Sequence, residues 1–313
     1  MRMSVWNTPR IIGCAENFPQ HIGLPRGCLD DVQTLLQENA IKLVLHDERF
    51  AGEPIDVRFA GKLRPDQEAA LVGMLEHDTG ILCAPTAFGK TVTAAALIAR
   101  RGVNTLILVH RTELLQQWKE RLQAFLEVDK SALGCLAGGK AKPTGIIDVA
   151  VMQSLSRQGE VSEQVQKYGQ IIVDECHHLS AISFEALLKA AGAKYVLGLT
   201  ATPIRRDGQQ PIIFMQCGPI RHTATRPESA PADLVVMPQW LSRQIVMPEG
   251  SGIQDVFLQV CSDTERTAKI IAEVKEASTQ GRKILVLTDR TDHLHAIEEQ
   301  LVGRVENLCI LHG

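Results

Sequence analysis

The sequence predicts an α/β fold in which helices cover both faces of a parallel sheet. Apolar strand-like segments alternate with helical segments between residues 62 and 210, which is the pattern of such a sheet. Apolar residues make up 45% of the 313 residues but aromatic residues only 4%, which suits packing by Val, Ile, Leu and Ala. Between 81 and 101, an apolar run leads through a loop of small residues into an alanine-rich helical segment. This order is typical of a strand–loop–helix unit.

The composition limits the location and partners of the protein. The net charge of −3 gives no sign of nucleic-acid binding, although a local basic rim is sufficient for contacts with a phosphate backbone. The eight cysteines are scattered without a Cys-x-x-Cys pair, as in proteins of reducing compartments. No apolar run approaches the about 18 residues of a membrane span, and the N-terminus lacks a signal-peptide pattern. We therefore expect a soluble cytoplasmic protein with no membrane partner.

Residues 1–61 are predicted to form a small α+β accessory unit. Residues Pro25–Asn39 have the spacing of an amphipathic helix, and Ile41–Leu45 and Ile55–Phe59 have the pattern of two strands. The sequence Ala51-Gly52-Glu53-Pro54 between them predicts a turn. No catalytic constellation is present in this part of the sequence, so its role stays open.

Residues 62–210 are predicted to form the main domain, followed by a linker and a smaller α/β segment. Six prolines between residues 211 and 250 favour a linker with short strands. Within 251–313 we expect helices at Asp263–Thr279 and Asp292–Leu301 and strands at Lys283–Thr288 and Val305–Leu311. Because so few strands make a small sheet with an open edge, we expect a truncated second domain.

The segment Ala84–Thr91 is predicted to be a phosphate-binding loop. Its small residues let backbone N–H groups turn toward a phosphate, and the following helix directs its positive dipole end to the same place. Lys90 can add a charge near the β- and γ-phosphates, and the Thr91 hydroxyl can ligate Mg²⁺. The alternative, a glycine turn with a chance lysine, is disfavoured by the strand before the loop and the helix after it.

A second candidate site follows the predicted strand Gln170–Asp174. A buried parallel strand delivers the residues at its end to the carboxyl edge of the sheet, where ligands of open α/β sheets bind. Asp174 is placed to hold Mg²⁺ through water, and Glu175 to orient or deprotonate an attacking water. A solvated strand end is the alternative, and the preceding phosphate loop favours the functional interpretation.

With these residues in view, the chain resembles the superfamily-2 helicases of the DEAD/DEAH-box type over residues 63–313. The matching motifs, in the order of the family, are Leu63–Gln67 (the adenine-reading motif), Ala84–Thr91 (motif I), Val109–Leu114 (motif Ia), Asp174–His177 (a DECH variant of motif II), Thr200–Thr202 (motif III) and Val286–Arg290 (motif IV). The resemblance implies a RecA-like domain at 62–210, a partial second one at 251–313, and ATP hydrolysis coupled to movement on nucleic acid.

The resemblance also implies roles for individual residues. The catalytic residues are Lys90, Asp174, Glu175 and His177, with Mg²⁺ held by Thr91 and Asp174. The ATP-binding residues are Arg64, Gln67, Pro85, Thr86, Ala87, Phe88, Gly89, Lys90 and Thr91. Thr200 and Thr202 couple the nucleotide state to the grip on the strand, and His110, Arg111, Gln153 and Ser154 contact nucleic acid. Single- or double-stranded nucleic acid is the expected partner, with DNA favoured over RNA. A P-loop GTPase is disfavoured because no Asn-Lys-x-Asp run is present.

Two segments narrow the resemblance within the superfamily. Arg205–Gly208, after motif III, is similar to the xeroderma-type repair helicases and their bacterial relatives. His21–Cys28 resembles helicase modules of bacterial conflict systems, in which a primase domain precedes the helicase. This second similarity implies an upstream primase domain or partner in the full-length system.

The sequence departs from the family pattern at two places. Ala87 stands where the family usually has glycine, and a positive φ there would cost on the order of 1 kcal/mol and loosen phosphate binding. In the family, motifs V and VI, with the arginine fingers, lie beyond residues 312–313, so no residue here is assigned that role. We therefore expect a longer natural polypeptide or source gene. The alternative function is a hydrolysis-deficient fragment that binds ATP or nucleic acid.

Three further sequence features each allow two interpretations. The Gly138-Gly139-Lys140 loop either contacts phosphate or is only a turn. Trp118 lies on a predicted helix at the spacing of core leucines, which favours packing over base stacking. Cys176, His177 and His178 are close together, but no further pair has the spacing of zinc ligands.

Overall fold

The computed structural model describes residues 14–137, 141–157, 160–178, 181–202, 210–225, 235–241, 247–248 and 250–311. They belong to two compact units, Met1–Ala232 and Asp233–Gly313. The predicted loop 138–140, the segment Arg205–Gly208 and the side chain of His178 lie outside the described residues.

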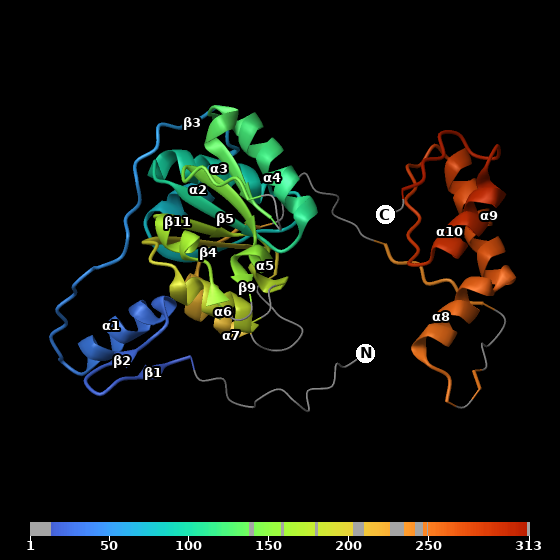
Figure 1. The fold of residues 1–313 in the computed structure, drawn as a ribbon. Coiled ribbons are helices and arrows are strands. Elements are labelled where there is room, and N and C mark those ends of the chain that lie inside the picture. The colour runs from blue at the N-terminus through green and yellow to red at the C-terminus, as the bar shows by residue number, and fades with distance from the viewer. Residues whose placement is uncertain are drawn as a thin grey trace. The chain divides into compact units, whose positions relative to one another are not determined.

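A seven-stranded parallel sheet forms the centre of the first unit and confirms the predicted fold class (Figure 1). Its spatial order is β13 (Ile220–Thr223), β4 (Thr79–Cys83), β12 (Tyr195–Thr200), β11 (Gln170–Val173), β5 (Thr105–Val109), β8 (Ile147–Val151) and β7 (Leu133–Leu136). Adjacent pairs are all parallel. The carboxyl ends of these strands therefore meet along one edge.

Helices cover both faces of the sheet because its strands are apolar on both sides (Figure 1). One core contains the buried faces of α2 (Pro65–Leu75), α3 (Lys90–Arg101) and α4 (Thr112–Phe125). The other contains residues of α5 (Met152–Leu155), η3 (Glu163–Lys167), α6 (Ala181–Ala190) and α7 (Gln210–Cys217). Along β5, Leu106 and Leu108 belong to the second core, and Ile107 and Val109 to the first. This alternation is the two-residue period of a strand.

Short elements complete the first unit. They are β1 (Glu16–Asn17), β2 (Ile22–Gly23), η1 (Arg26–Cys28), α1 (Leu29–Glu38), β3 (Arg58–Phe59), β6 (Leu126–Glu127), η2 (Lys130–Ala132), β9 (Ser156–Arg157), β10 (Glu160–Val161) and η4 (Cys176–His178). The strands pair β1 with β2, β9 with β10 and β3 with β6.

The N-terminal segment packs on the helices at one face of the sheet. The guanidinium of Arg26 donates hydrogen bonds to the carbonyls of Leu188, Ala191 and Ala193, at 2.8, 2.5 and 2.8 Å. The predicted helix is present as η1 and α1, but the predicted strand Ile41–Leu45 is wrong, and only Arg58–Phe59 of the second strand pairs. An apolar alternating run becomes a strand only where another strand offers backbone hydrogen bonds, and residues 41–45 have no such neighbour among the described residues.

Residues 211–223, expected to be part of the linker, form α7 and β13 in the structure. Ile220–Thr223 lies beside β4 at one edge of the sheet. The prolines of this region are compatible with a helix and a strand. Pro211 lies in the first turn of α7 and Pro219 precedes β13, and at these positions a proline breaks no backbone hydrogen bond of the element.

The described residues of the second unit form three helices: α8 (Ile253–Ser262), α9 (Thr264–Thr279) and α10 (Thr291–Leu301). The two helical predictions agree with α9 and α10 to within one residue. The strands predicted at Lys283–Thr288 and Val305–Leu311 are wrong, since the described residues of this unit contain no strand. Leu285 and Leu287 are 80% and 82% exposed, while Val286 packs against the helices. The segment therefore has one buried side, as a strand would, but no neighbouring strand among the described residues to pair with.

Among the described residues, no helix combines the length and apolar character needed to cross a membrane.

Candidate nucleotide and nucleic-acid site

The phosphate-loop candidate connects the end of β4 to the start of α3, as predicted. The Ala84 N–H donates to the Thr200 carbonyl of β12 at 2.9 Å, which fixes the start of the loop to the neighbouring strand. Phe88 is fully buried beneath the loop. Gly89, with φ +91°, precedes α3, and a Cβ there would lie 2.5 Å from Gln67 Nε2. A side chain at this position would therefore be strained by the left-handed conformation and would displace the Gln67 amide.

Lys90 starts α3 and directs its side chain back across the loop. Its Nζ donates to the Ala84 carbonyl at 3.1 Å and lies 3.4 Å from Oε1 of Glu175. Thr91 follows in the first turn of the helix and is half-buried, whereas Thr86 and Ala87 are exposed at the top of the loop. The helix N-terminus and the ammonium group together form a positive site for phosphate.

Ala87 has a φ of +66°, so the sequence departure falls on a left-handed position. Replacing Ala87 with glycine is expected to tighten nucleotide binding several-fold and to stabilise the protein by up to about 1 kcal/mol, because glycine adopts this conformation without steric cost. Nucleotide titration and thermal unfolding measure the two effects. Ala40→Gly is the matched control, since Ala40 also has a positive φ of 54° but follows α1. An equal change of nucleotide affinity in both variants would exclude a local effect.

The acid pair lies directly after β11, at the middle of the sheet. Asp174 is 9% exposed, and its carboxylate accepts a 2.7 Å hydrogen bond from Nε1 of Trp118. Burial raises the pKa of the Asp174 carboxyl, and the hydrogen bond from Trp118 opposes this rise. Glu175 has a φ of 45° and a partly exposed side chain, with Oε1 near Lys90. Its Oε2 lies 3.4 Å from His177 Nδ1.

His177 connects the acid pair to the end of β12. Its Nδ1 lies 2.8 Å from the hydroxyl oxygen of Thr200. That hydroxyl donates its single hydrogen to the Thr202 carbonyl at 2.7 Å and accepts from the Thr202 N–H at 3.2 Å. His177 and the two residues predicted to couple nucleotide state to strand grip, Thr200 and Thr202, form a continuous hydrogen-bonded chain.

Arg64 and Gln67, predicted to bind ATP, contact the phosphate loop itself. Gln67 is 3% exposed, accepts from the Arg64 N–H at 3.0 Å and donates to the Phe88 carbonyl at 2.8 Å. The Arg64 guanidinium donates to the same carbonyl at 2.7 Å and lies over the Phe88 ring. The start of α2 thus supports the loop from below, a role that the motif alone does not reveal.

The predicted nucleic-acid contacts lie at the ends of two neighbouring strands. His110 and Arg111 follow β5, and Gln153 and Ser154 lie on α5, directly after β8. Val109 and Val151 are direct partners in this strand pair, so the residues that follow them emerge side by side. Arg111, Gln153 and Ser154 are exposed. The sheet therefore brings together four residues that are far apart in the sequence.

The residues present fit a magnesium ion. Mg²⁺ prefers hard oxygen ligands, and the Thr91 hydroxyl and the Asp174 carboxylate, both of which lie near Lys90, offer such oxygens. Among the described residues, no group of three His, Cys, Asp or Glu side chains is arranged to hold a metal ion by itself.

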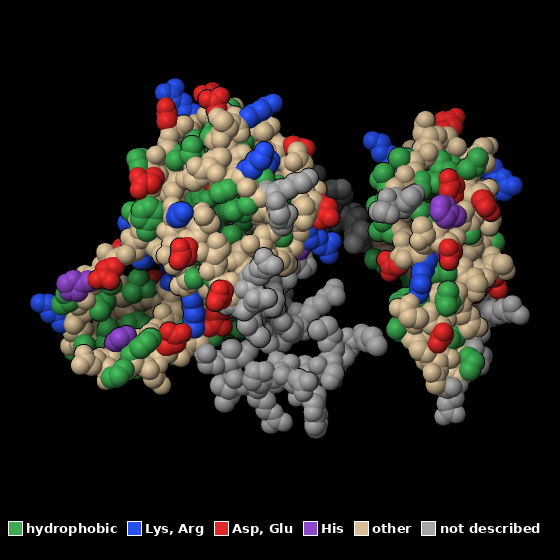
Figure 2. Space-filling view, in the orientation of Figure 1, with side chains coloured by type: hydrophobic (Ala, Val, Ile, Leu, Met, Phe, Trp, Pro, Cys, Tyr) green, Lys and Arg blue, Asp and Glu red, His purple; other side chains and the backbone are tan. Residues whose placement is uncertain are grey.

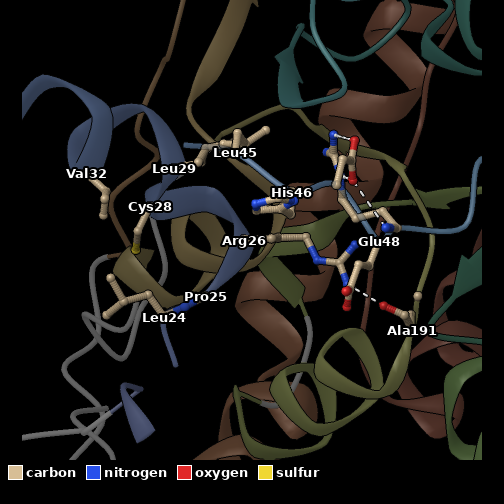
Figure 3. A pocket seen from close by; sticks show the side chains of 13 residues that line it. Leu24, Pro25, Arg26, Cys28, Leu29, Val32, Leu45, His46, Glu48 and Ala191 are labelled. Atoms are coloured by element: carbon tan, nitrogen blue, oxygen red, sulfur yellow. Dashed lines mark hydrogen bonds and ion pairs between the residues drawn. The ribbon is translucent and has the colours of Figure 1, made fainter. Parts of the chain in front are cut away.

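A cavity of about 520 Å³ lies away from this site, between the N-terminal segment and the end of α6 (Figure 3). Leu24, Leu29, Val32 and Leu45 form its apolar part. Figure 2 shows hydrophobic side chains gathered over the same part of the surface. The guanidiniums of Arg26 and Arg49 at its polar side donate to carbonyls and carboxylates of the chain.

Comparison with known proteins identifies relatives. Residues 60–205 match the family model described as "Type III restriction enzyme, res subunit". The DNA 3'-5' translocase XPB2 of Sulfurisphaera tokodaii is 34% identical over 159 residues, which cover 51% of this chain and 35% of that protein. The DNA 3'-5' helicase XPB of Mycobacterium tuberculosis is 28% identical over 258 residues, covering 78% of this chain and 47% of that protein. The chain thus spans less than half the length of these two relatives.

The UvsW helicase of bacteriophage T4 is similar in fold. Its crystal structure has a TM-score of 0.50 and 18% identity, and the match covers 65% of this chain and 80% of that chain. At this identity the likeness concerns the fold alone. The strand order and this likeness agree in showing the RecA-like sheet of helicase domains. In sequence, residues 60–205 match the restriction-enzyme family model, and the chain is similar to the XPB-type DNA helicases and translocases named above.

Proposed function

We propose that the chain hydrolyses ATP and uses the energy to move on nucleic acid. The observation that carries the proposal is the arrangement along one sheet edge. Lys90 and Glu175 are in contact, Asp174 lies beside them, and His177 continues from them to Thr200 and Thr202. Exposed polar side chains follow the adjacent strands β5 and β8. Ligands of open α/β sheets bind at this edge.

The residues at this sheet edge would have separate roles in phosphoryl transfer. The loop N–H groups, the N-terminus of α3 and Lys90 bind the phosphates, and a Mg²⁺ held by Thr91 and Asp174 would neutralise charge on the β- and γ-phosphates. Phosphates that attract Lys90 would draw its ammonium away from Ala84 and Glu175. Glu175 would then be free to orient and deprotonate the attacking water.

His177 and Thr200 connect the γ-phosphate position to the strand ends that face nucleic acid. A change at Glu175 would pass through Nδ1 of His177 to the Thr200 hydroxyl and the Thr202 backbone. Arg111 and nearby N–H groups would hold phosphates and sugars without reading bases. Because the relatives are named as DNA helicases and translocases, we propose DNA as the substrate.

Two finer parts of the proposal remain predictions. A cytoplasmic location is supported by the eight cysteines, all of which are free thiols. An upstream primase domain or partner is supported by the sequence resemblance of residues 21–28 alone.

Lys90→Ala tests the proposed function. Wild-type protein is expected to hydrolyse ATP faster with single-stranded DNA than without it. The variant is expected to lose both MgATP binding and turnover, because it lacks the ammonium group beside the phosphates. Coupled assays of phosphate release and nucleotide titrations measure these effects.

The control is Lys119→Ala, at a half-buried position on α4. Nucleotide binding without turnover would support the alternative of a binding fragment that does not hydrolyse ATP. Wild-type turnover no faster than that of Lys90→Ala would exclude hydrolysis by this chain.

A further inference from the structure

Trp118 makes a contact that neither its sequence position nor the proposed mechanism accounts for. It lies in the second turn of α4 and is 2% exposed. Its indole N–H donates to Oδ2 of Asp174 at 2.7 Å, across 56 positions of sequence. An indole N–H can only donate, and a short bond to a carboxylate is among the stronger hydrogen bonds of a protein interior.

The position of Trp118 is determined by its packing in the apolar core and not by the nucleotide site. Leu115, Trp118 and Leu122 follow each other at helical spacing on the buried face of α4 and belong to one apolar cluster. The indole is therefore held in place before any ligand arrives. Its donor reaches the strand end at which the acid pair begins.

Asp174 needs such a partner. Rotation of a carboxylate about its last bond is only weakly restricted by local sterics, because that bond joins an sp³ and an sp² carbon. Trp118 is the described side chain that donates a hydrogen bond to this carboxylate, and the bond engages Oδ2. The bond from Trp118 does not engage Oδ1.

We propose that Trp118 is a positioning residue for Asp174. It holds Oδ2 against α4, and this fixes the rotation at which Oδ1 is presented to Mg²⁺ and its water shell. The proposal rests on the proposed function, since it gives the Asp174 carboxylate the task of holding the metal. Helix α4 would thus contribute to the nucleotide site through Trp118, a side chain that is buried in the core.

The test compares Trp118→Phe, which keeps an aromatic ring in the core, with Asp174→Asn and the double variant. The measured quantity is the Mg²⁺ concentration that half-saturates binding of a fluorescent ATP analogue, followed by anisotropy. Trp118→Phe is expected to require about tenfold more Mg²⁺, since loss of a partner that orients a metal ligand costs roughly 10–100-fold in metal affinity. Its binding of the analogue in EDTA is expected to equal that of wild type.

Two controls separate positioning from packing. Trp240→Phe makes the same change at a tryptophan that is 82% exposed in the second unit, and it is expected to leave the Mg²⁺ requirement unchanged. In the Asp174→Asn background, Trp118→Phe is expected to cause no further change, because residues acting through one interaction are not additive. If Trp118→Phe fails to fold, replacing the indole with the isosteric benzothiophene side chain removes the N–H donor alone.

The outcomes distinguish this proposal from the proposed function. An unchanged Mg²⁺ requirement in Trp118→Phe, or an equal loss in the Asp174→Asn background, overturns the positioning role and leaves the nucleotide site intact. Weaker binding in EDTA to the same extent would show a packing effect and also overturn it. Wild-type protein that binds the analogue without any Mg²⁺ dependence would overturn the assigned metal site and with it this proposal.

Discussion

Replacing Glu175 with glutamine is expected to slow ATP hydrolysis by a factor of about 10²–10⁴ while MgATP affinity stays close to that of wild type. The amide keeps the size of the side chain and an oxygen for Lys90, whose Nζ lies 3.4 Å from Oε1. It cannot accept a proton from water at neutral pH, so the general-base contribution is lost. Single-turnover hydrolysis and a nucleotide titration on the same preparation measure the two quantities.

The matched control is Glu127→Gln, which makes the same change at an exposed position in β6. It is expected to leave both turnover and affinity unchanged. A Glu175→Gln protein that loses affinity and turnover to the same degree would assign Glu175 to nucleotide binding. A variant with wild-type turnover would exclude Glu175 as the base.

Replacing Asp148 with alanine is expected to lower the free energy of unfolding by about 3–5 kcal/mol. This carboxylate is fully buried in β8 and accepts from the N–H groups of Thr144 and Gly145, at 2.9 and 2.8 Å, and from the Tyr168 hydroxyl at 2.6 Å. Burial raises the pKa of Tyr168, so the phenol stays a protonated donor. Alanine would leave these donors buried without an acceptor. Urea unfolding measures the loss.

Asp56→Ala is the control for Asp148, because Asp56 is exposed, and its effect is expected to stay within about 0.5 kcal/mol. A loss below about 1 kcal/mol in Asp148→Ala would mean that water replaces the carboxylate in this network. The same variant also reports on function, since β8 leads directly to α5 with Gln153 and Ser154.

The inner strands of the sheet could be predicted from sequence because each is a short apolar run. The apolar pattern predicts strands at Asn104–Val109, Ile146–Met152, Gln170–Asp174 and Tyr195–Leu199. The observed bounds of β5, β8, β11 and β12 differ from these by at most one residue at each end. The edge strand β13 was missed because Ile220–Thr223 carries an arginine and a histidine and contains no fully buried residue. The other edge strand, β7, was also missed, although Leu133–Leu136 is mostly buried. Edge strands are buried less, so they lack the continuous apolar signal of the centre.

The candidate site could be predicted only where its residues are local in sequence. The phosphate loop and the acid pair are contiguous motifs, and each motif sits where its flanking strand ends. The bond from Trp118 to Asp174 and the contact of Gln67 with the Phe88 carbonyl join residues 56 and 21 positions apart. Such contacts depend on how α4 and α2 are packed on the sheet, and helical periodicity reveals only which face is buried.

The strand order sets the distance between the phosphate loop and the residues that follow β8. Between β4, which carries the phosphate loop, and β8, which leads to Gln153 and Ser154, lie β12, β11 and β5. Four inter-strand spacings of about 4.8 Å place the two strand ends about 19 Å apart, farther than one small inhibitor extends. A compound bound at the phosphate loop would therefore leave Gln153 and Ser154 accessible.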